Sequence, residues 1–183
     1  MLHQISILSD YTRMAKSVKE IIIQKNTKGY GQNFNRDWLE YKRGFGSIED
    51  KTYWMGLDEI NKLTTSGSYS LEIHLEKNGV TNVVKWSSFK VGSELEKYKL
   101  SISGFDAGTS GLTDQLAYHN GKYFTTRDKD NDKSGNENCA QLYGSGGSGW
   151  WFYNCYSSQL NKADSSGPSY SDSYDESTMI LKR

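Results

Sequence analysis

The 183-residue chain lacks a long apolar run, and it lacks an excess of charge of either sign. The longest apolar candidate is Ile21-Ile22-Ile23, far short of the roughly 18 residues that span a bilayer, so we expect no membrane insertion. The 22 basic and 22 acidic residues balance, and no dense basic segment provides the electrostatic footprint of a nucleic-acid-binding protein. We therefore expect neither a bilayer nor nucleic acid as a partner.

Cysteine and proline are also scarce, with only Cys139, Cys155 and a single proline. In an extracellular protein two cysteines most simply form one intrachain disulfide, which would stabilise the fold by roughly 3 kcal/mol through loop closure. A zinc site is the alternative. Zinc takes about four nitrogen or sulfur ligands in close groups, whereas His3, His74 and His119 are scattered in the sequence. The disulfide is therefore the favoured prediction.

Glycine and aromatic residues are abundant by contrast, with 18 glycines, 13 tyrosines and 5 tryptophans. Such a composition is typical of a turn-rich domain, and the length suits one globular unit with its own core. Tyrosine and tryptophan combine a flat apolar ring with a polar tip, which suits both a sugar-binding surface and a core. Composition alone does not decide between these two roles.

Helical signals are confined to short segments. Apolar spacing predicts a helix over residues 10–23. Asn35 is a suitable N-cap for a helix over residues 36–43, and Asp58 for a second one over residues 59–63. These helices are too short to build a bundle.

Strand signals follow these helices. Residues 71–76 alternate apolar and polar side chains, as a half-buried strand does, and Asn78-Gly79 is a strong hairpin turn. The return strand is expected over residues 80–86 and a further strand over residues 99–103. After Phe105, glycine, serine, aspartate and asparagine are dense, so we expect loops there. Binding residues tend to lie on loops held by a rigid scaffold.

An acidic run gives the clearest chemical signal. Residues 128–132 place three carboxylates within five positions, with nothing apolar to bury, and a bound hard cation such as calcium explains this arrangement. An EF-hand is excluded because Lys133 stands where glycine is needed and Cys139 where glutamate is needed. A solvated acidic turn, with its charge partly offset by Lys129 and Lys133, is the alternative.

Catalytic motifs are missing from the sequence. It contains no nucleophile elbow, no phosphate-binding glycine loop and no metalloprotease helix motif. Neighbouring acids on one loop do not flank a substrate as the two carboxylates of a glycoside hydrolase do. We therefore expect a protein that is not an enzyme.

Several blocks of sequence occur in a fixed order. They lie at residues 33–38, 41–46, 53–58, 88–92, 118–121, 125–132, 139–143 and 149–155. Together they resemble the fibrinogen C-terminal-like domain of fibrinogens, ficolins, tenascins, angiopoietins and tachylectin-type lectins. Residues 20–25 are similar to the end of a family strand, and residues 1–19 stay unassigned.

The resemblance covers residues 20–183 and implies an α+β fold. The expected architecture is a twisted, mainly antiparallel sheet flanked by short helices, with a loop-rich calcium- and ligand-binding subdomain at about residues 105–175. In this family calcium is held by the first two acids of such a run and by two backbone carbonyls further along. The expected metal ligands are Asp128, Asp130, Asp132 and Ser134.

In lectin-like members of the family a pocket beside the calcium takes an acetyl group. Its methyl packs among aromatic rings, and its carbonyl meets backbone donors near the second cysteine. Asn154-Cys155 matches a peptide bond that is often cis in the family, and His119 matches a structural position. The expected ligand-binding residues are Tyr143, Asn154, Cys155, Tyr156 and Tyr170.

Two departures from the family pattern leave the function open. Tyr156 stands where histidine is common, and a tryptophan-containing segment after Tyr170 is missing. The first hypothesis is calcium-dependent recognition of acetylated or related glycans, as in innate immune defence. The alternative is a protein-interaction or adhesion module with a purely structural calcium, and a domain that binds calcium poorly is a third outcome.

The resemblance and the disulfide imply an extracellular location. Residues 1–19 lack the basic start, apolar run and cleavage site of a signal peptide. We therefore expect the sequence to be a fragment or a divergent isoform, with its targeting signal elsewhere. Oligomerisation would likewise depend on segments outside this sequence, and it would matter because linked sites gain avidity.

Overall fold

The computed structural model describes residues 20–142 and 146–183. Most of the helix predicted over residues 10–23 lies outside the described residues, and its last residues belong to strand β1 (Glu20–Thr27). The helix prediction was therefore wrong for residues 20–23, whereas the strand implied by the family resemblance is confirmed. β1 pairs with a strand on each side, so the β-branched isoleucines adopt the extended backbone that the sheet requires.

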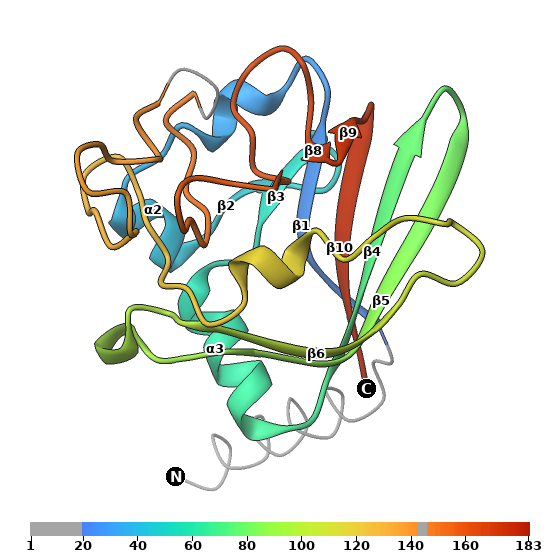
Figure 1. The fold of residues 1–183 in the computed structure, drawn as a ribbon, viewed down its shortest axis with the longest axis horizontal. Coiled ribbons are helices and arrows are strands. Elements are labelled where there is room, and N and C mark those ends of the chain that lie inside the picture. Colours follow the sequence, from blue (N-terminus) through green and yellow to red (C-terminus); the bar gives the residue numbers. More distant parts are fainter. Residues whose placement is uncertain (1–19, 143–145) are drawn as a thin grey trace, which may run out of the picture.

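A seven-stranded sheet organises the molecule (Figure 1), in the order β2-β3-β1-β10-β4-β5-β6. All six pairs of neighbouring strands are antiparallel, which confirms the predicted α+β fold class. The last strand, β10, lies between β1 and β4, so the first and last strands of the described residues pair in the middle of the sheet. The other strands are β2 (Phe45–Ser47), β3 (Thr52–Trp54), β4 (Ser70–Lys77), β5 (Val80–Val91), β6 (Leu100–Asp106) and β10 (Glu176–Lys182).

The β4–β5 hairpin confirms the Asn78-Gly79 prediction. Asn78 and Gly79 have φ angles of 53° and 75°, and two successive positive values are those of the turn that Asn-Gly favours. Strand β5 continues to Val91, beyond the predicted end at residue 86, because its second half pairs with β6. The local pattern could not show this long-range partner.

Two α-helices and three short 3-10 helices accompany the large sheet in the described residues. Helix α2 (Trp38–Arg43) begins after Asp37, not Asn35, because Asp37 and Glu40 form a reciprocal capping box. The aspartate and the glutamate three residues later were a signal that the sequence already carried. The 3-10 helices are η1 (Gly31–Phe34), η2 (Glu94–Glu96) and η3 (Leu116–His119).

Helix α3 (Leu57–Ser66) also begins earlier than predicted, with Gly56 rather than Asp58 as its N-cap. Gly56 has a φ of 103°, and a Cβ there would lie 2.7 Å from the carbonyl carbon of Arg43. The close approach of the two segments therefore requires glycine. Asp58 accepts a hydrogen bond from the hydroxyl of Tyr98 at 2.5 Å instead.

Aromatic side chains build the centre of the core. The ring of Phe124 lies 5.1 to 6.4 Å from those of Trp38, Tyr41, Trp54 and Trp151. All five tryptophans are at most 7% exposed, so they pack the interior and none offers its face to a sugar. The abundance of tryptophan is thus explained by the core.

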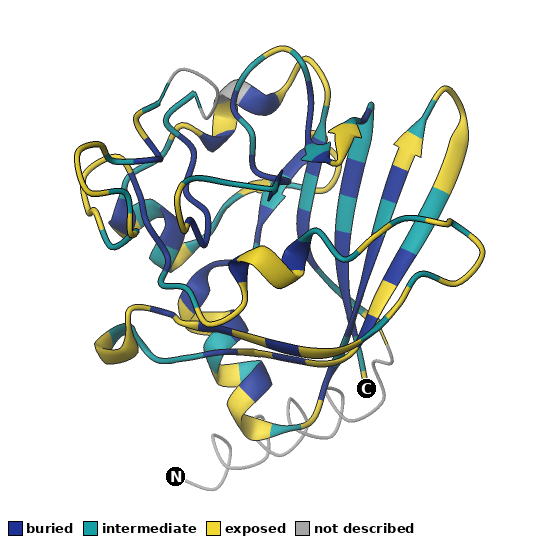
Figure 2. Ribbon diagram, viewed as in Figure 1, coloured by how far each residue is buried: buried dark blue, intermediate teal, exposed yellow. Residues whose placement is uncertain are grey.

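The region between β6 and β10 contains few regular elements, as the composition predicted. A small sheet joins β7 (Ser158–Gln159), β8 (Ser169–Tyr170) and β9 (Asp172–Ser173). Figure 2 shows exposed residues along the outer loops and at the tip of the β4–β5 hairpin, while the middle of the large sheet is mostly buried. Within the described residues no helix is long and apolar enough to cross a membrane.

We predict that Gly149→Ala destabilises the fold by about 2 kcal/mol, because a Cβ there would lie 2.7 Å from the ring of Phe124 and 2.8 Å from that of Tyr41. Gly135→Ala is the matched control, since nothing lies within 4 Å of its Cβ position. Urea unfolding of both variants gives the two free energies. Equal stabilities would contradict this close packing.

Candidate metal and ligand site

The disulfide ties two loops of the candidate site together. Cys139 and Cys155 are bonded, with their Cα atoms 5.3 Å apart, which confirms the predicted pairing. Cys139 follows the acidic loop and Cys155 follows the Trp150-Trp151 pair. The bond therefore fixes the acidic loop against the segment expected to bind the ligand.

Asp128 has a structural role that sequence reasoning did not foresee. Its Oδ1 accepts hydrogen bonds from the Trp38 amide at 2.9 Å and from the Thr126 hydroxyl at 2.7 Å. Trp38 is the first residue of α2, so a carboxylate there is favoured by the helix dipole. No described residue forms a hydrogen bond to Oδ2 of Asp128, which leaves that oxygen available to a cation.

Asp132 is held by the backbone. Its Oδ1 accepts from the Ser134 amide and its Oδ2 from the Cys139 amide, both at 2.8 Å. Burial raises the pKa of this carboxyl, the two amides oppose that effect, and the charge of Asp130 reinforces it. Since both carboxylate oxygens are used, Asp132 could bind a cation through its carbonyl, which is the role that the family resemblance implies.

Asp130 is exposed, and its Oδ1 accepts only the amide of Asp132, at 3.1 Å. Its second oxygen has no hydrogen-bond partner among the described residues. The neighbouring Lys129 does not neutralise it by an ion pair, because the ammonium lies 4.0 Å above the ring of Trp38. Asp128 and Asp130 thus each offer one carboxylate oxygen.

These residues fit a hard cation. Nowhere in the described ranges do three or more histidine, cysteine, aspartate or glutamate side chains gather as a metal centre, so a cation here needs backbone ligands as well. The donors on offer are two carboxylate oxygens and the carbonyls of Asp132 and Ser134. All are oxygen atoms, the ligands that calcium prefers.

The second half of the site is the loop at Asn154 and Cys155. The peptide bond between them is cis, as the resemblance implied. The carbonyl of Asn154 accepts a hydrogen bond from the hydroxyl of Tyr118 at 2.8 Å, and that of Cys155 accepts the amide of Tyr153 at 3.0 Å. No described residue accepts a hydrogen bond from the Cys155 amide. The loop therefore offers a free backbone donor beside exposed tyrosines.

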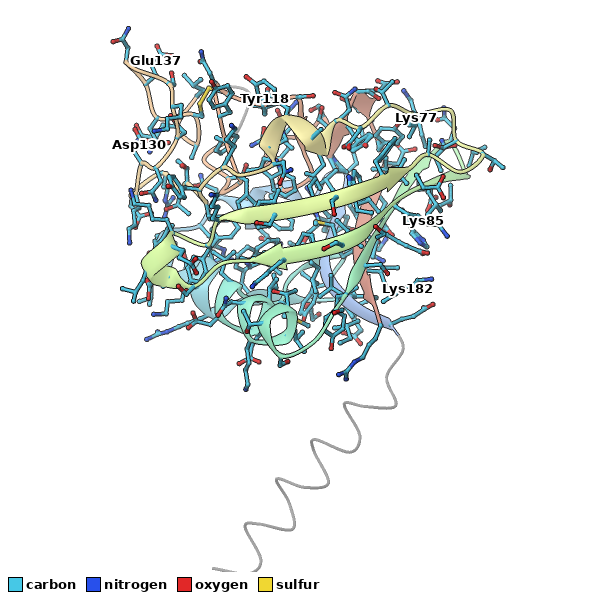
Figure 3. All side chains as sticks on the ribbon, turned by 60° about the horizontal axis from the view of Figure 1, so that its bottom comes forward. Lys77, Lys85, Tyr118, Asp130, Glu137 and Lys182 are labelled. Atoms are coloured by element: carbon cyan, nitrogen blue, oxygen red, sulfur yellow. A yellow bond between two sulfur atoms is a disulfide. The ribbon has the colours of Figure 1, made fainter. Side chains whose placement is uncertain are left out.

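Tyr118 and Tyr153 are the residues that sequence reasoning missed. They are 37% and 38% exposed, and their rings form an edge-to-face pair with centroids 5.5 Å apart. Their positions beside His119 and Asn154 were visible in the sequence, but their contact across the fold was not. Figure 3 shows Tyr118 away from Lys77, Lys85 and Lys182, with Asp130 at the opposite end of the molecule from these lysines.

The other predicted ligand residues differ in accessibility. Tyr143 lies outside the described residues. Tyr156 is half-buried, with its ring centroid 6.3 Å from that of Phe152. Asn154 is exposed, whereas Cys155 is half-buried. The structure thus brings Asn154, Cys155 and Tyr156 together in one loop.

Tyr170 is fully buried. Its hydroxyl donates to the carbonyl of Thr113 at 2.9 Å and accepts the amide of Gln115 at 3.2 Å. Burial raises its pKa, so it stays a neutral phenol. Tyr170 therefore holds the loop at residues 113–115 through these two hydrogen bonds, and its buried ring is not exposed to a ligand.

His119 holds the segment that follows the second cysteine. Its ring is fully buried, with Nδ1 2.7 Å from the carbonyl of Trp151 and Nε2 accepting the amides of Ser157 at 3.3 Å and Ser158 at 3.1 Å. Desolvation lowers its pKa from 6.5 to about 4. A neutral imidazole with both nitrogens used is a structural residue, in agreement with its family position.

Comparisons with known proteins agree with this description. The family model for the C-terminal globular domain of the fibrinogen beta and gamma chains matches residues 3–178, and the protein belongs to this family. Tenascin-R of Gallus gallus is 39% identical over 141 residues, which are 77% of this sequence and 10% of tenascin-R. The protein therefore spans about a tenth of the length of that curated relative.

Solved structures share the fold. The fibrinogen-like globe domains of human ANGPTL2 and ANGPTL6 both have TM-scores of 0.77, with identities of 32% and 29%. The matches cover 89% and 88% of this protein and 79% and 76% of those domains' chains. A lamprey fibrin D-dimer, complexed with the peptide Gly-His-Arg-Pro-amide, has a TM-score of 0.71 at 28% identity, covering 88% of this protein and 60% of the fibrin chain.

We predict that His119 makes stability depend on pH. In the unfolded protein the imidazole of His119 is protonated below pH 6.5, whereas in the folded protein it is protonated only below about pH 4. The free energy of unfolding is therefore highest above pH 6.5 and falls by roughly 3 kcal/mol as the pH drops to 4. Denaturant unfolding between pH 4 and pH 7.5 measures this slope.

In the His119→Gln variant much of this slope should disappear, although the variant is also less stable at pH 7. His74→Gln is the control, because His74 is only half-buried on β4. An unchanged slope in His119→Gln would show that other groups cause the pH dependence.

Proposed function

We propose that this domain is an extracellular, non-enzymatic recognition module that binds acetylated or related glycans with the help of calcium. Membership of the fibrinogen C-terminal family and the disulfide support the extracellular location. The observation that carries the glycan proposal is the Cys155 amide, which no described residue accepts as a hydrogen-bond donor, beside the exposed ring of Tyr118. Such a surface suits recognition of foreign glycans in innate immune defence.

Calcium would act on the shape of the loop. Asp128 and Asp130 would hold it by carboxylate oxygens, and Asp132 and Ser134 by their carbonyls. A bound cation would reduce the repulsion between the carboxylates. The acidic loop reaches the ligand loop through the hydrogen bond from the Cys139 amide to Asp132 and then through the disulfide to Cys155. A cation that orders the acidic loop would therefore also restrain the loop at Asn154 and Cys155.

The acetyl group would be held by complementary contacts. We assign the Cys155 amide as the donor to its carbonyl oxygen, since a neutral donor suits a neutral amide acceptor. The half-buried ring of Tyr156 and the exposed ring of Tyr118 provide apolar surface for the methyl group. Tyr170 would contribute indirectly, because its hydrogen bonds to residues 113 and 115 hold the neighbouring loop in place.

A protein-interaction or adhesion module with a purely structural calcium is the second candidate. The lamprey fibrin structure, which is complexed with a short peptide, and the similarity to tenascin-R favour it. A backbone amide donates to a peptide carbonyl as readily as to an acetyl carbonyl, so the Cys155 amide, which has no acceptor among the described residues, is compatible with both candidates. The two therefore have to be separated by experiment.

We predict that Asp130→Asn weakens calcium binding at least tenfold, because one charged ligand becomes neutral while the asparagine oxygen can still accept the Asp132 amide. Asp106→Asn is the matched control, since Asp106 is also exposed and its Oδ1 accepts the amide two residues on. Calorimetric titration of calcium into chelator-treated protein measures both. Absence of calcium binding by the unchanged protein would identify a domain that has lost the site.

We also predict that N-acetylglucosamine binds in calcium but not in excess chelator, and that glucose does not bind in either, because only the first sugar carries an acetyl group. Calorimetric titration with the unchanged protein and Asp130→Asn tests both points. Calcium binding without any heat from N-acetylglucosamine would overturn the glycan proposal and favour the protein-interaction module.

A further inference from the structure

We propose that a basic hollow next to the ligand loop receives an anionic substituent, sulfate or carboxylate, carried by the glycan. The hollow has a volume of about 150 Å³, which is too small for a whole sugar but sufficient for one such group. No aspartate or glutamate lines it. Its lining includes Gly121, Lys122, Tyr123, Asn131, Lys133 and Tyr153.

The lysines of this hollow are not engaged by carboxylates within the described residues. Neither Lys122 nor Lys133 forms an ion pair with any residue that the structure describes. By contrast, Lys85 and Lys182 both bind the carboxylate of Glu72 at 2.9 Å. No carboxylate among the described residues therefore neutralises either ammonium through an ion pair.

Two further lysines lie next to residues of the lining. The ammonium of Lys97 lies 5.3 Å from the ring centroid of Tyr123, and a Cβ on Gly121 would lie 3.9 Å from Cε of Lys99. Neither lysine forms an ion pair among residues 20–142 and 146–183. Lys122 and Lys133 line the hollow, and Lys97 and Lys99 lie next to two residues of its lining, so positive charge gathers around this small concavity, a pattern that attracts anions.

The geometry places a sugar ring beside the bound anion. The Lys122 ammonium lies 4.0 Å from the ring centroid of Tyr153, a position stabilised by cation–π attraction. Tyr153 is itself held by the Tyr118 ring and by the hydrogen bond from the Lys133 amide to its carbonyl at 2.9 Å. Its ring is 38% exposed, so a sugar can contact the part of the ring that Lys122 does not cover.

This inference rests on the proposed function, because it specifies the substituents of the glycan that the domain binds. Tyr153 precedes Asn154, so the hollow adjoins the acetyl-binding loop directly. Asp130 and Asp132 flank Asn131, a residue of the lining, and calcium would reduce their repulsion of an anion. Calcium should therefore strengthen binding of the charged sugar more than that of a neutral one.

The test compares three sugars by calorimetric titration in calcium: N-acetylglucosamine, N-acetylglucosamine 6-sulfate and glucuronic acid. We expect at least one charged sugar to bind at least tenfold more tightly than the neutral sugar, with an affinity that falls as salt is added. A preference for the sulfated sugar identifies sulfate as the substituent, and a preference for glucuronic acid identifies the carboxylate.

The double variant Lys122→Gln, Lys133→Gln should lose this preference, with the ratio of affinities falling close to one, while calcium binding persists. Lys51→Gln is the matched control, because its ammonium also faces a tyrosine ring, that of Tyr30 at 5.5 Å, and also lacks an ion pair among the described residues. Thermal unfolding checks that both variants fold.

A double variant that keeps the preference, or an unchanged protein that binds charged and neutral sugars equally, would overturn the proposal. The two proposals fail separately. If a charged sugar binds in a lysine-dependent way and N-acetylglucosamine does not bind, the proposal for the basic hollow is supported and the proposal for the acetyl site is rejected. If N-acetylglucosamine binds and charged sugars bind no more tightly, the acetyl site is supported and the basic hollow is rejected.

Discussion

The packing of Phe124 and Thr125 against Trp150 and Trp151 is the contact on which the loop-rich half of the molecule depends. Thr125 and Trp150 exchange backbone hydrogen bonds of 2.9 and 3.1 Å, and the Phe124 and Trp151 rings meet edge to face at 5.2 Å. These contacts hold the start of the acidic loop against the segment that leads to Cys155. Since the region has few strands of its own, this aromatic contact takes the place of regular structure in fixing the site.

The acids of the candidate metal loop have two functions that must be separated. Asp128 connects the loop to α2, and Asp132 connects it to Cys139, so both carboxylates stabilise the fold before any cation binds. Asp130 has only a local hydrogen bond. It follows that a substitution at Asp128 would change the fold and the proposed cation site together, whereas a substitution at Asp130 would act mainly on the proposed cation site.

The sequence was most informative where the signal was local. Asn78-Gly79 predicted its hairpin because this turn needs residues that tolerate positive φ angles, as asparagine and glycine do. The two cysteines left one possible disulfide pairing. The contact of Asp128 with Trp38 joins residues 90 positions apart, and that of Tyr118 with Asn154 joins residues 36 positions apart. No periodicity or motif reports such contacts, so the second role of Asp128 and the exposed tyrosines emerged only from the fold.

The contacts that hold residues 151–158 also bear on how the proposed loop site could bind a small ligand. Ordering a free loop on binding costs conformational entropy, which would remove most of the affinity of a small ligand. Here the disulfide, the neutral His119 and the Tyr118 hydroxyl each fix one side of the segment at residues 151–158. Because these contacts already position the segment, the Cys155 amide, which has no acceptor among the described residues, would need no further ordering to act as the proposed donor. In the proposed binding mode, a ligand carbonyl would therefore reach this amide without a rearrangement of the segment.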